Sequence, residues 1–158
     1  MTSVVHGWAM SDADTGVAPR IAVAAAFLWL GMVLAISFLE APLKFRAPGL
    51  QLRGGLAIGR IVFRALNLAE VGWLIVIVVC LMVDPPSLTI STVAAGSGLL
   101  LVVQLAVVRP RLNRRSDQVL AGDGGSDAPR SHAHHAYIGL ETLKVAALIT
   151  LGCYLLAA

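Results

Sequence analysis

The chain has 158 residues, of which 58% are hydrophobic and only 13% charged, and its mean hydropathy is +0.82. Soluble domains carry about 25% charged residues, so this composition is typical of a membrane protein with one domain. The net charge of +3 is not gathered on a soluble basic module, which excludes a nucleic-acid-binding domain. Cys80 and Cys153 stand in apolar runs without a CxxC motif, and we interpret them as small buried hydrophobes.

A polar start precedes four apolar runs. Residues 1–20 mix acidic and basic side chains, which predicts a flexible segment. The apolar runs 21–39, 65–83, 88–108 and 136–157 have about 19–22 residues each, enough to cross a hydrocarbon core of about 30 Å as a helix. The predicted spans are 21–39, 60–83, 88–108 and 135–157. We therefore expect an all-α membrane protein, a four-transmembrane-helix bundle that occupies residues 21–158.

The connections between the spans differ in length. "DPPS" (Asp84–Ser87) breaks the helix because proline cannot continue it, so the second and third spans form an antiparallel hairpin. Longer loops are predicted over 40–59 and 109–134, and "AGDGGSDAP" in the second of them is typical of disorder. The segment Ala41–Phe63 combines apolar and basic residues, which predicts a position in the membrane interface against anionic lipid.

Basic residues predict the orientation. Ten of the twelve Lys and Arg residues lie on or beside the two longer loops, which an even number of crossings places on one side. The positive-inside rule makes that side cytoplasmic, so both termini are expected outside (N-out/C-out). A cleaved signal peptide ending at "AIS" (Ala35–Ser37) is the rival interpretation, but it would leave five or more positive charges on the translocated side, and we reject it. We expect a multi-pass protein of a bacterial plasma membrane.

Two of the spans carry polar residues at helical spacing. Residues three, four or seven apart share one face of a helix, so each set forms a stripe. The stripes are Arg60, Arg64, Asn67 and Glu70 on the second span, and His134, Tyr137, Glu141 and Lys144 on the fourth.

Depth along the helices predicts how these charges pair. Counted from the cytoplasmic ends at 1.5 Å per residue, Glu70 lies about 15 Å deep and Lys144 about 13.5 Å. An unpaired charge at mid-helix costs about 2.5–3.5 kcal/mol on insertion scales, and opposite charges at one depth cancel that cost. We therefore predict that Glu70 pairs with Lys144. By the same count Glu141 and Asn67 lie at about 9 and 10.5 Å, so Glu141 is predicted to contact Arg64 or Asn67.

Gln104 on the third span lies about 7.5 Å from Arg109, in the same half of the membrane, and completes a polar layer. The predicted intramembrane polar site consists of Arg64, Asn67, Glu70, Gln104, Glu141 and Lys144. One interpretation is a site for a solute, proton or ion, because ionisable residues within a membrane usually mark function. The other is structural: polar side chains fix the register of packed helices.

"SHAHH" places His132, His134 and His135 at the cytoplasmic mouth of the fourth span, and a close histidine cluster is a candidate metal site. Bis-histidine haem would need a second histidine at matched depth, whereas His6 lies near the opposite face. No cofactor is predicted, and a metal ion or haem stays an alternative. The sequence shows no Ser-His-Asp set, no paired-carboxylate site and no phosphate loop, so we expect a non-enzymatic protein.

The order of motifs is similar to that of a known family. "LWLGMVLAISFLEAPLKF" is followed by "GGLAIGRIVFRAL", then by "QLAVVRPRLNRR" and by a histidine that opens the last span. Over roughly Leu28–Leu156 the chain resembles the transmembrane protein 205-like family, four-helix membrane proteins whose bacterial members are mostly of unknown function. The resemblance implies a four-helix fold and matches His134 or His135 to the family's histidine. Glu141 and Lys144 depart from it, because neutral residues are expected at those positions.

Three classes of function follow from these features. The leading prediction is non-enzymatic handling or gating of a small solute or ion, as a homo-oligomer or with a membrane partner, because four helices leave little room for a pathway. The first alternative is a structural or accessory subunit of a larger membrane complex. The second alternative is a metal- or haem-binding membrane redox protein.

Overall fold

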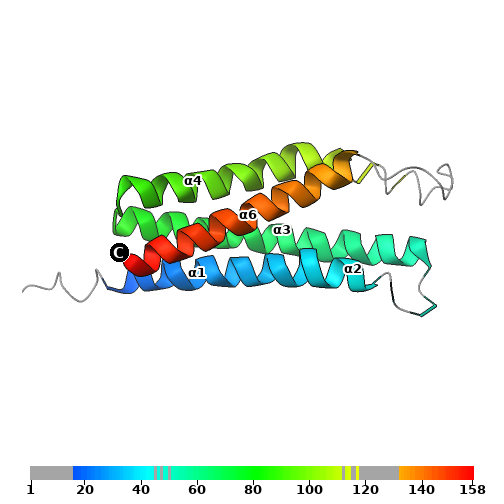
Figure 1. The fold of residues 1–158 in the computed structure, drawn as a ribbon, viewed down its shortest axis with the longest axis horizontal. Coiled ribbons are helices and arrows are strands. Elements are labelled where there is room, and N and C mark those ends of the chain that lie inside the picture. The colour runs from blue at the N-terminus through cyan, green and yellow to red at the C-terminus, as the bar shows by residue number, and fades with distance from the viewer. Residues whose placement is uncertain are drawn as a thin grey trace, which may run out of the picture.

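The computed structural model describes residues 16–44, 46, 48–49, 51–111, 113–114, 117 and 132–158, except for the side chains of 52–53 and 132–136. The elements within these ranges are helical (Figure 1). They are α1 (Val17–Val33), the π-helix η1 (Leu34–Glu40), α2 (Ala41–Lys44), α3 (Leu52–Val83), α4 (Leu88–Val103), the π-helix η2 (Gln104–Val108) and α6 (His132–Ala157).

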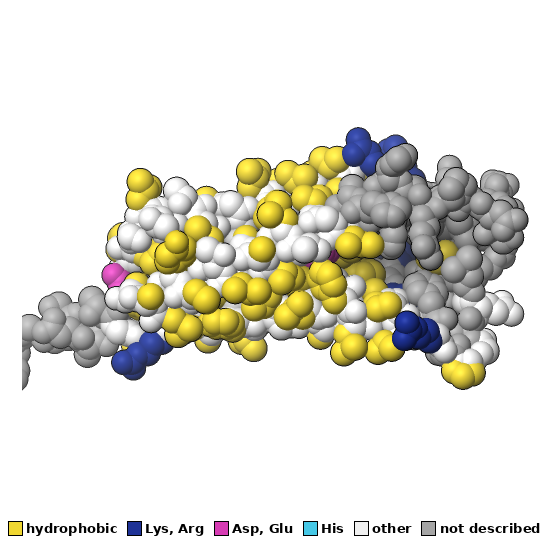
Figure 2. Space-filling view, in the orientation of Figure 1, with side chains coloured by type: hydrophobic (Ala, Val, Ile, Leu, Met, Phe, Trp, Pro, Cys, Tyr) yellow, Lys and Arg dark blue, Asp and Glu magenta, His cyan; other side chains and the backbone are white. Residues whose placement is uncertain are grey.

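Four long rods lie side by side in an elongated bundle (Figure 1). Each is long and apolar enough to cross a membrane, as expected for a multi-pass membrane protein. Their bounds are Val17–Lys44, Gly54–Val83, Leu88–Arg111 and Tyr137–Ala157. Figure 2 shows hydrophobic side chains along the length of the face it presents, with charged side chains gathered towards the two ends. The predicted all-α class and the four apolar helices are thus present.

The core lies where the four rods meet. α1 packs against α3 on one side and α6 on the other, and α6 also packs against α4. Each rod contributes large side chains that are at most 1% exposed. These are Trp29 from α1, Ile77 from α3, Leu101 from α4, and Leu148 and Leu151 from α6. Small residues on α1, including the buried Ala22, Ala25 and Ala26, allow its neighbours to approach closely.

The helices are longer than the predicted spans. The loop predicted over 40–59 is shorter, because the first rod continues to Lys44 and α3 begins at Leu52. Gly49 makes the turn between them with φ of 78°, a conformation that favours glycine. Much of the expected interfacial segment Ala41–Phe63 therefore belongs to the two rods.

The two other expected irregular segments also change at their edges. α1 begins at Val17, inside the segment predicted to be flexible, and residues 1–15 lie outside the described part of the chain. The third rod extends to Arg111 and α6 begins at His132, both within the predicted loop 109–134. Polar and basic side chains can continue a helix past its apolar run, because their charged ends reach water while their stems pack on the helix.

Gly152 shows how closely α1 and α6 approach. It is buried, and a Cβ placed on it would lie 2.8 Å from Cζ of Phe27. We expect Gly152→Val to lower the free energy of unfolding by about 1–3 kcal/mol, because the branched side chain would displace the Phe27 ring from its contact with α6. Gly139→Val on the same helix is the matched control, since a Cβ there meets no atom within 4 Å. Thermal unfolding of the purified protein in detergent would test this; equal losses in both variants would contradict it.

Candidate functional site

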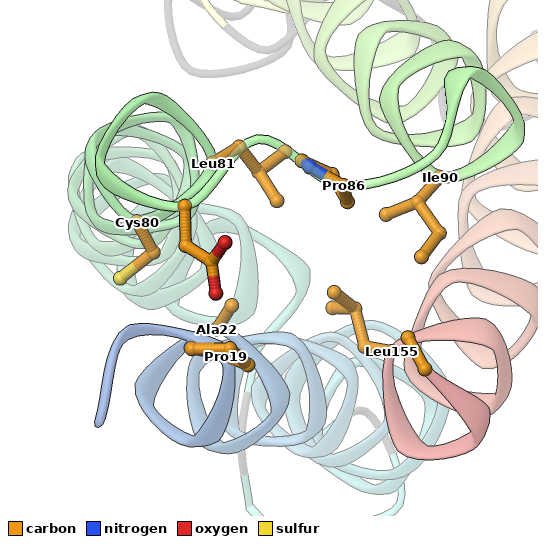
Figure 3. A pocket seen from close by; sticks show the side chains of 9 residues that line it. Pro19, Ala22, Cys80, Leu81, Pro86, Ile90 and Leu155 are labelled. Carbon is orange, nitrogen blue, oxygen red and sulfur yellow. The ribbon is translucent and has the colours of Figure 1, made fainter. Parts of the chain in front are cut away.

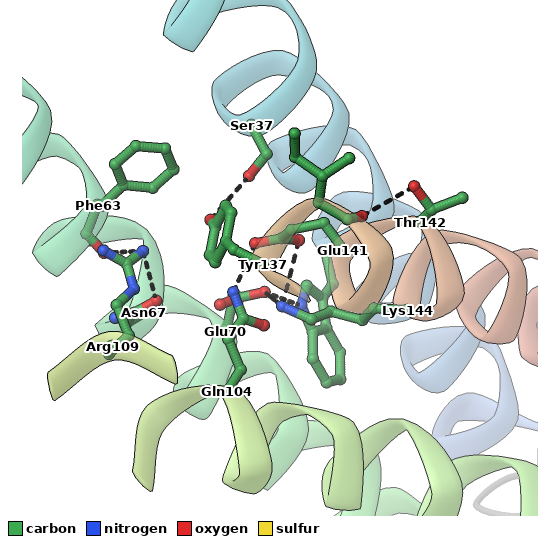
Figure 4. A network of polar contacts seen from close by, with 12 residues as sticks. Ser37, Phe63, Asn67, Glu70, Gln104, Arg109, Tyr137, Glu141, Thr142 and Lys144 are labelled. Atoms are coloured by element: carbon green, nitrogen blue, oxygen red, sulfur yellow. Dashed lines mark hydrogen bonds and ion pairs between the residues drawn. The ribbon is translucent and has the colours of Figure 1, made fainter. Parts of the chain in front are cut away.

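A cluster of ionised side chains is enclosed in the bundle, with Lys144 at its centre (Figure 4). Its Nζ donates a hydrogen bond to Oε1 of Glu70 at 2.5 Å and lies 3.4 Å from Oε2 of Glu141. Glu70 comes from α3, whereas Glu141 precedes Lys144 by one turn of α6. All three residues are at most 1% exposed. This arrangement joins α3 to α6 through a contact that water does not reach.

Two neutral groups complete the cluster from the other rods. Nε1 of Trp29 on α1 donates to Oε1 of Glu70 at 3.1 Å, and Nε2 of Gln104 donates to Oε1 of Glu141 at 2.6 Å. Trp29 and Gln104 are themselves fully buried. A buried Trp N–H and a buried amide both need partners, and the carboxylates provide them. The five residues Trp29, Glu70, Gln104, Glu141 and Lys144, here named the ionic cluster, therefore unite all four rods.

The ionic cluster has more negative charge and more acceptors than it can balance. Two carboxylates share one ammonium, so its net charge is −1 when all three groups are ionised. Oε2 of Glu70 and Oε1 of Gln104 are buried without a hydrogen-bond donor among the described residues, and Oε2 of Glu141 has only its 3.4 Å ion pair with Lys144. Each unsatisfied buried polar atom costs about 1–3 kcal/mol. A bound proton or another small cation would reduce both the excess negative charge and the number of unsatisfied acceptors.

π-helices occur in the first and third rods of the bundle. η2 starts at Gln104, a member of the ionic cluster, and η1 contains Ser37, whose Oγ lies 3.4 Å from the hydroxyl of Tyr137. π-helical turns are rare and occur often at functional sites, because the inserted residue changes the direction of the side chains that follow. Here they place polar side chains of η1 and η2 toward α6.

A second polar group lies beside the ionic cluster. The guanidinium of Arg109 lies 4.6 Å from the Phe63 ring centre and 5.5 Å from that of Tyr137, and the two rings meet edge to face. Arg109 also donates to Oδ1 of Asn67 at 3.1 Å and to the carbonyl of Phe63 at 3.4 Å. Tyr137 lies one turn before Glu141 on α6, so this group is continuous with the ionic cluster (Figure 4).

The structure brings together four of the six predicted site residues. Glu70 and Lys144 are in contact, as their matched depths predicted. Gln104 joins them through Glu141. The predicted contact of Glu141 with Arg64 or Asn67 is wrong: Glu141 faces η2 and its own helix, Asn67 binds Arg109, and Arg64 is exposed. The reason is that α6 packs against α1 and α4, so its inward face meets Gln104 before it meets the start of α3.

Sequence reasoning did not assign Trp29 or Arg109 to the site. Trp29 stands in an apolar run, where its only polar signal is the indole N–H, which seeks an acceptor when buried. Arg109 looked like one of the ten basic residues that set the orientation. Only the structure shows that Arg109 directly follows the π-helix η2, which begins at Gln104.

The histidine prediction is not tested by the described residues. His132, His134 and His135 open α6, but their side chains lie outside the described part, as does His6. Among the residues that are described, no group of three or more His, Cys, Asp or Glu could hold a metal ion. Cys80 and Cys153 are free thiols, the first buried and the second exposed.

Two pockets lie at opposite ends of the bundle, each of about 220 Å³. The first is at the end with the C-terminus and is lined mainly by apolar groups from all four rods, together with Asp84 (Figure 3). The second contains Arg60, Arg64 and Arg109. Neither pocket is lined by a member of the ionic cluster, which is closed in this conformation.

Comparison with known proteins gives no relative: no family model matches the chain, and no curated protein or solved structure matches it. The function must therefore be inferred from the site itself.

Removal of the central cation tests the ionic cluster. We expect Lys144→Met to lower the free energy of unfolding by about 3–5 kcal/mol, because it leaves two buried carboxylates without a cation. The double variant Glu70→Gln, Lys144→Met should recover part of that loss. Glu40→Gln, which removes a half-buried carboxylate outside the cluster, serves as the control. Thermal unfolding and yield of monodisperse protein would be measured; a double variant no more stable than the worse single variant would refute the pairing.

Proposed function

We propose that this chain is a four-span integral protein of a bacterial plasma membrane, N-out/C-out, that handles a small ion at the ionic cluster. The four apolar rods support the membrane location. The excess of Lys and Arg at the two connections on one end supports the orientation. The resemblance to the transmembrane protein 205-like family agrees with four spans and assigns no activity.

The observation that carries the ion-handling proposal is that Glu70 and Glu141 share Lys144 in a fully buried site. Two carboxylates that share one ammonium have a net charge of −1, and a net charge in a low-dielectric interior is costly. A proton is the smallest ligand that removes the excess charge. On Glu70 it would also turn Oε2, which has no hydrogen-bond partner among the described residues, into a donor. Proton binding and release is therefore the form of ion handling that we propose.

Movement of the ion would need the bundle to open, because neither pocket reaches the ionic cluster. The group formed by Arg109, Phe63 and Tyr137 lies between the cluster and the basic end of the bundle, and is the natural place for such an opening. Four helices leave little space for a pathway, so a homo-oligomer or a membrane partner belongs to the proposal.

The complete burial of the ionic cluster favours a second candidate function, a structural or accessory subunit of a membrane complex. In that case the ionic cluster fixes the register of the four rods and binds no ligand. The two candidates predict different behaviour of Glu141→Gln. A structural role needs the carboxylate for stability, whereas a proton site loses exchange but keeps its packing. The redox alternative depends on histidine side chains outside the described residues.

Glu141→Gln tests proton handling directly. The full-length protein would be placed in liposomes that contain a pH-sensitive dye, and a potassium gradient with valinomycin would drive proton entry. We expect wild-type flux, flux in the control Glu40→Gln, and none in Glu141→Gln. The thermal stability of Glu141→Gln should not fall, because the change removes excess buried charge. Absence of flux in the wild type, together with a large stability loss in Glu141→Gln, would support the structural candidate instead.

Infrared spectroscopy gives an independent readout of the same variant. A pH-induced difference spectrum of the wild type should contain the carbonyl band of a protonated carboxylic acid. That band should persist in Glu40→Gln and disappear in Glu141→Gln or in Glu70→Gln. A spectrum without such a band at any pH at which the protein stays folded would rule out a proton bound at the cluster.

The orientation has its own test. In a Cys80→Ala, Cys153→Ala background, Ser87→Cys lies in the turn between α3 and α4, and Asn113→Cys lies beyond the other end of the third rod. We expect a membrane-impermeant maleimide to label Ser87→Cys in intact spheroplasts and Asn113→Cys only after lysis. The reverse pattern would invert the orientation, and labelling of both from outside would refute the four-span arrangement.

A further inference from the structure

The pocket at the end of the bundle away from the C-terminus is basic. It is lined by Arg60, Arg64, Asn67, Leu105, Arg109, Pro110 and Asn113, and is here named the basic pocket. Arg60 and Arg64 are one turn apart on α3, and Arg109 follows η2 at the end of the third rod. Three guanidinium groups from two rods therefore line one cavity.

Among the described residues, the basic pocket has more positive charge than negative charge. Arg60 forms an ion pair with Asp117 at 2.5 Å, in an exposed position. Arg64 has no hydrogen bond or ion pair with another described residue, and Arg109 is bonded only to neutral oxygens. Three cations against one carboxylate leave a charge of +2. Like charges held this close repel each other unless an anion joins them.

Arg109 is fixed in position and still has a free donor. The rings of Phe63 and Tyr137 and the oxygen of Asn67 hold its guanidinium in place. Its Nε is buried and has no acceptor among the described residues, so this donor is unsatisfied in the present conformation. The side-chain nitrogen of Asn67 is not used in the contact with Arg109, because Oδ1 of Asn67 accepts that hydrogen bond.

We propose that the basic pocket binds a phosphate group. Guanidinium groups bind phosphate through paired hydrogen bonds, and the amides of Asn67 and Asn113 can add donors. A volume of 220 Å³ equals that of about seven water molecules in the liquid, which is enough for a phosphate and its first substituent. Leu105 and Pro110 give the pocket an apolar wall. The phosphate belongs either to an anionic phospholipid headgroup, for which basic pockets between membrane helices are suited, or to a free phosphate anion.

This proposal does not depend on ion handling at the ionic cluster, since the two sites share no residue. It does connect with it physically. Arg109 contacts Tyr137, which lies one turn before Glu141, so an anion bound to Arg109 would lie one residue contact away from the ionic cluster.

Two binding experiments on the full chain distinguish the sources of the phosphate. Native mass spectrometry in detergent would measure retention of phosphatidylglycerol against phosphatidylcholine. Isothermal titration with inorganic phosphate would measure binding of the free anion. Retention of phosphatidylglycerol alone assigns the headgroup, heat of binding with inorganic phosphate alone assigns the free anion, and both results together assign a site that accepts either one.

Variants separate a specific pocket from general attraction of a basic surface. We expect Arg64→Gln to weaken binding of the probe about tenfold, because it removes one charge-assisted contact. Arg109→Lys keeps the charge but loses the fork and the free Nε–H, and should weaken it by a similar factor. Arg114→Gln is the matched control: this arginine is exposed at the same end of the bundle and does not line the pocket.

Three results would overturn the proposal. The first is that neither probe binds the wild type. The second is that Arg114→Gln weakens binding as much as Arg64→Gln, which would indicate a diffuse surface charge. The third is unchanged binding in both Arg64→Gln and Arg109→Lys. Because Arg64 is exposed and lacks a partner among the described residues, its variant should fold even if substitution at Arg109 prevents folding.

Discussion

The contact between Lys144 and Glu70 is the constraint on which the rest of the bundle depends. Apolar helix surfaces slide and rotate against one another with little change in energy, so they define a register weakly. A buried ammonium is paired only when the helix that carries its counter-ion has one particular height and one particular rotation about its axis. Once α3 and α6 are fixed in this way, Trp29 and Gln104 find their acceptors and bring α1 and η2 into the same layer.

The polar interior is graded along the bundle. Towards the C-terminus of the chain the core is apolar and ends in a pocket lined mostly by hydrophobic groups. The ionic cluster follows, then the aromatic pair Phe63 and Tyr137 with Arg109, and then the basic pocket. Negative charge in the interior and positive charge at one mouth produce an electric field along the bundle axis. Both proposed ligands, a proton at the carboxylates and a phosphate at the arginines, match the local sign of that field.

The pairing of Glu70 with Lys144 could be predicted because it depends on quantities that a sequence contains. The rise of a helix converts residue number into depth, and opposite charges at one depth attract. The partner of Glu141 could not be predicted in this way. Depth says nothing of the direction in which a side chain points around its helix, and Asn67 at a similar depth binds Arg109 instead. Helix ends were also misjudged, because basic residues extend a helix beyond its apolar run.

The sequence by itself determined that the chain forms four long apolar helices, because a run of that length leaves backbone groups no other way to pair in an apolar medium. It also indicated which charges need compensation. Only the tertiary structure decided which rods are neighbours, and hence that Gln104 rather than Arg64 serves Glu141 and that Arg109 is held by two rings. Those contacts depend on the rotation of each helix about its axis, which the packing of all four rods sets together.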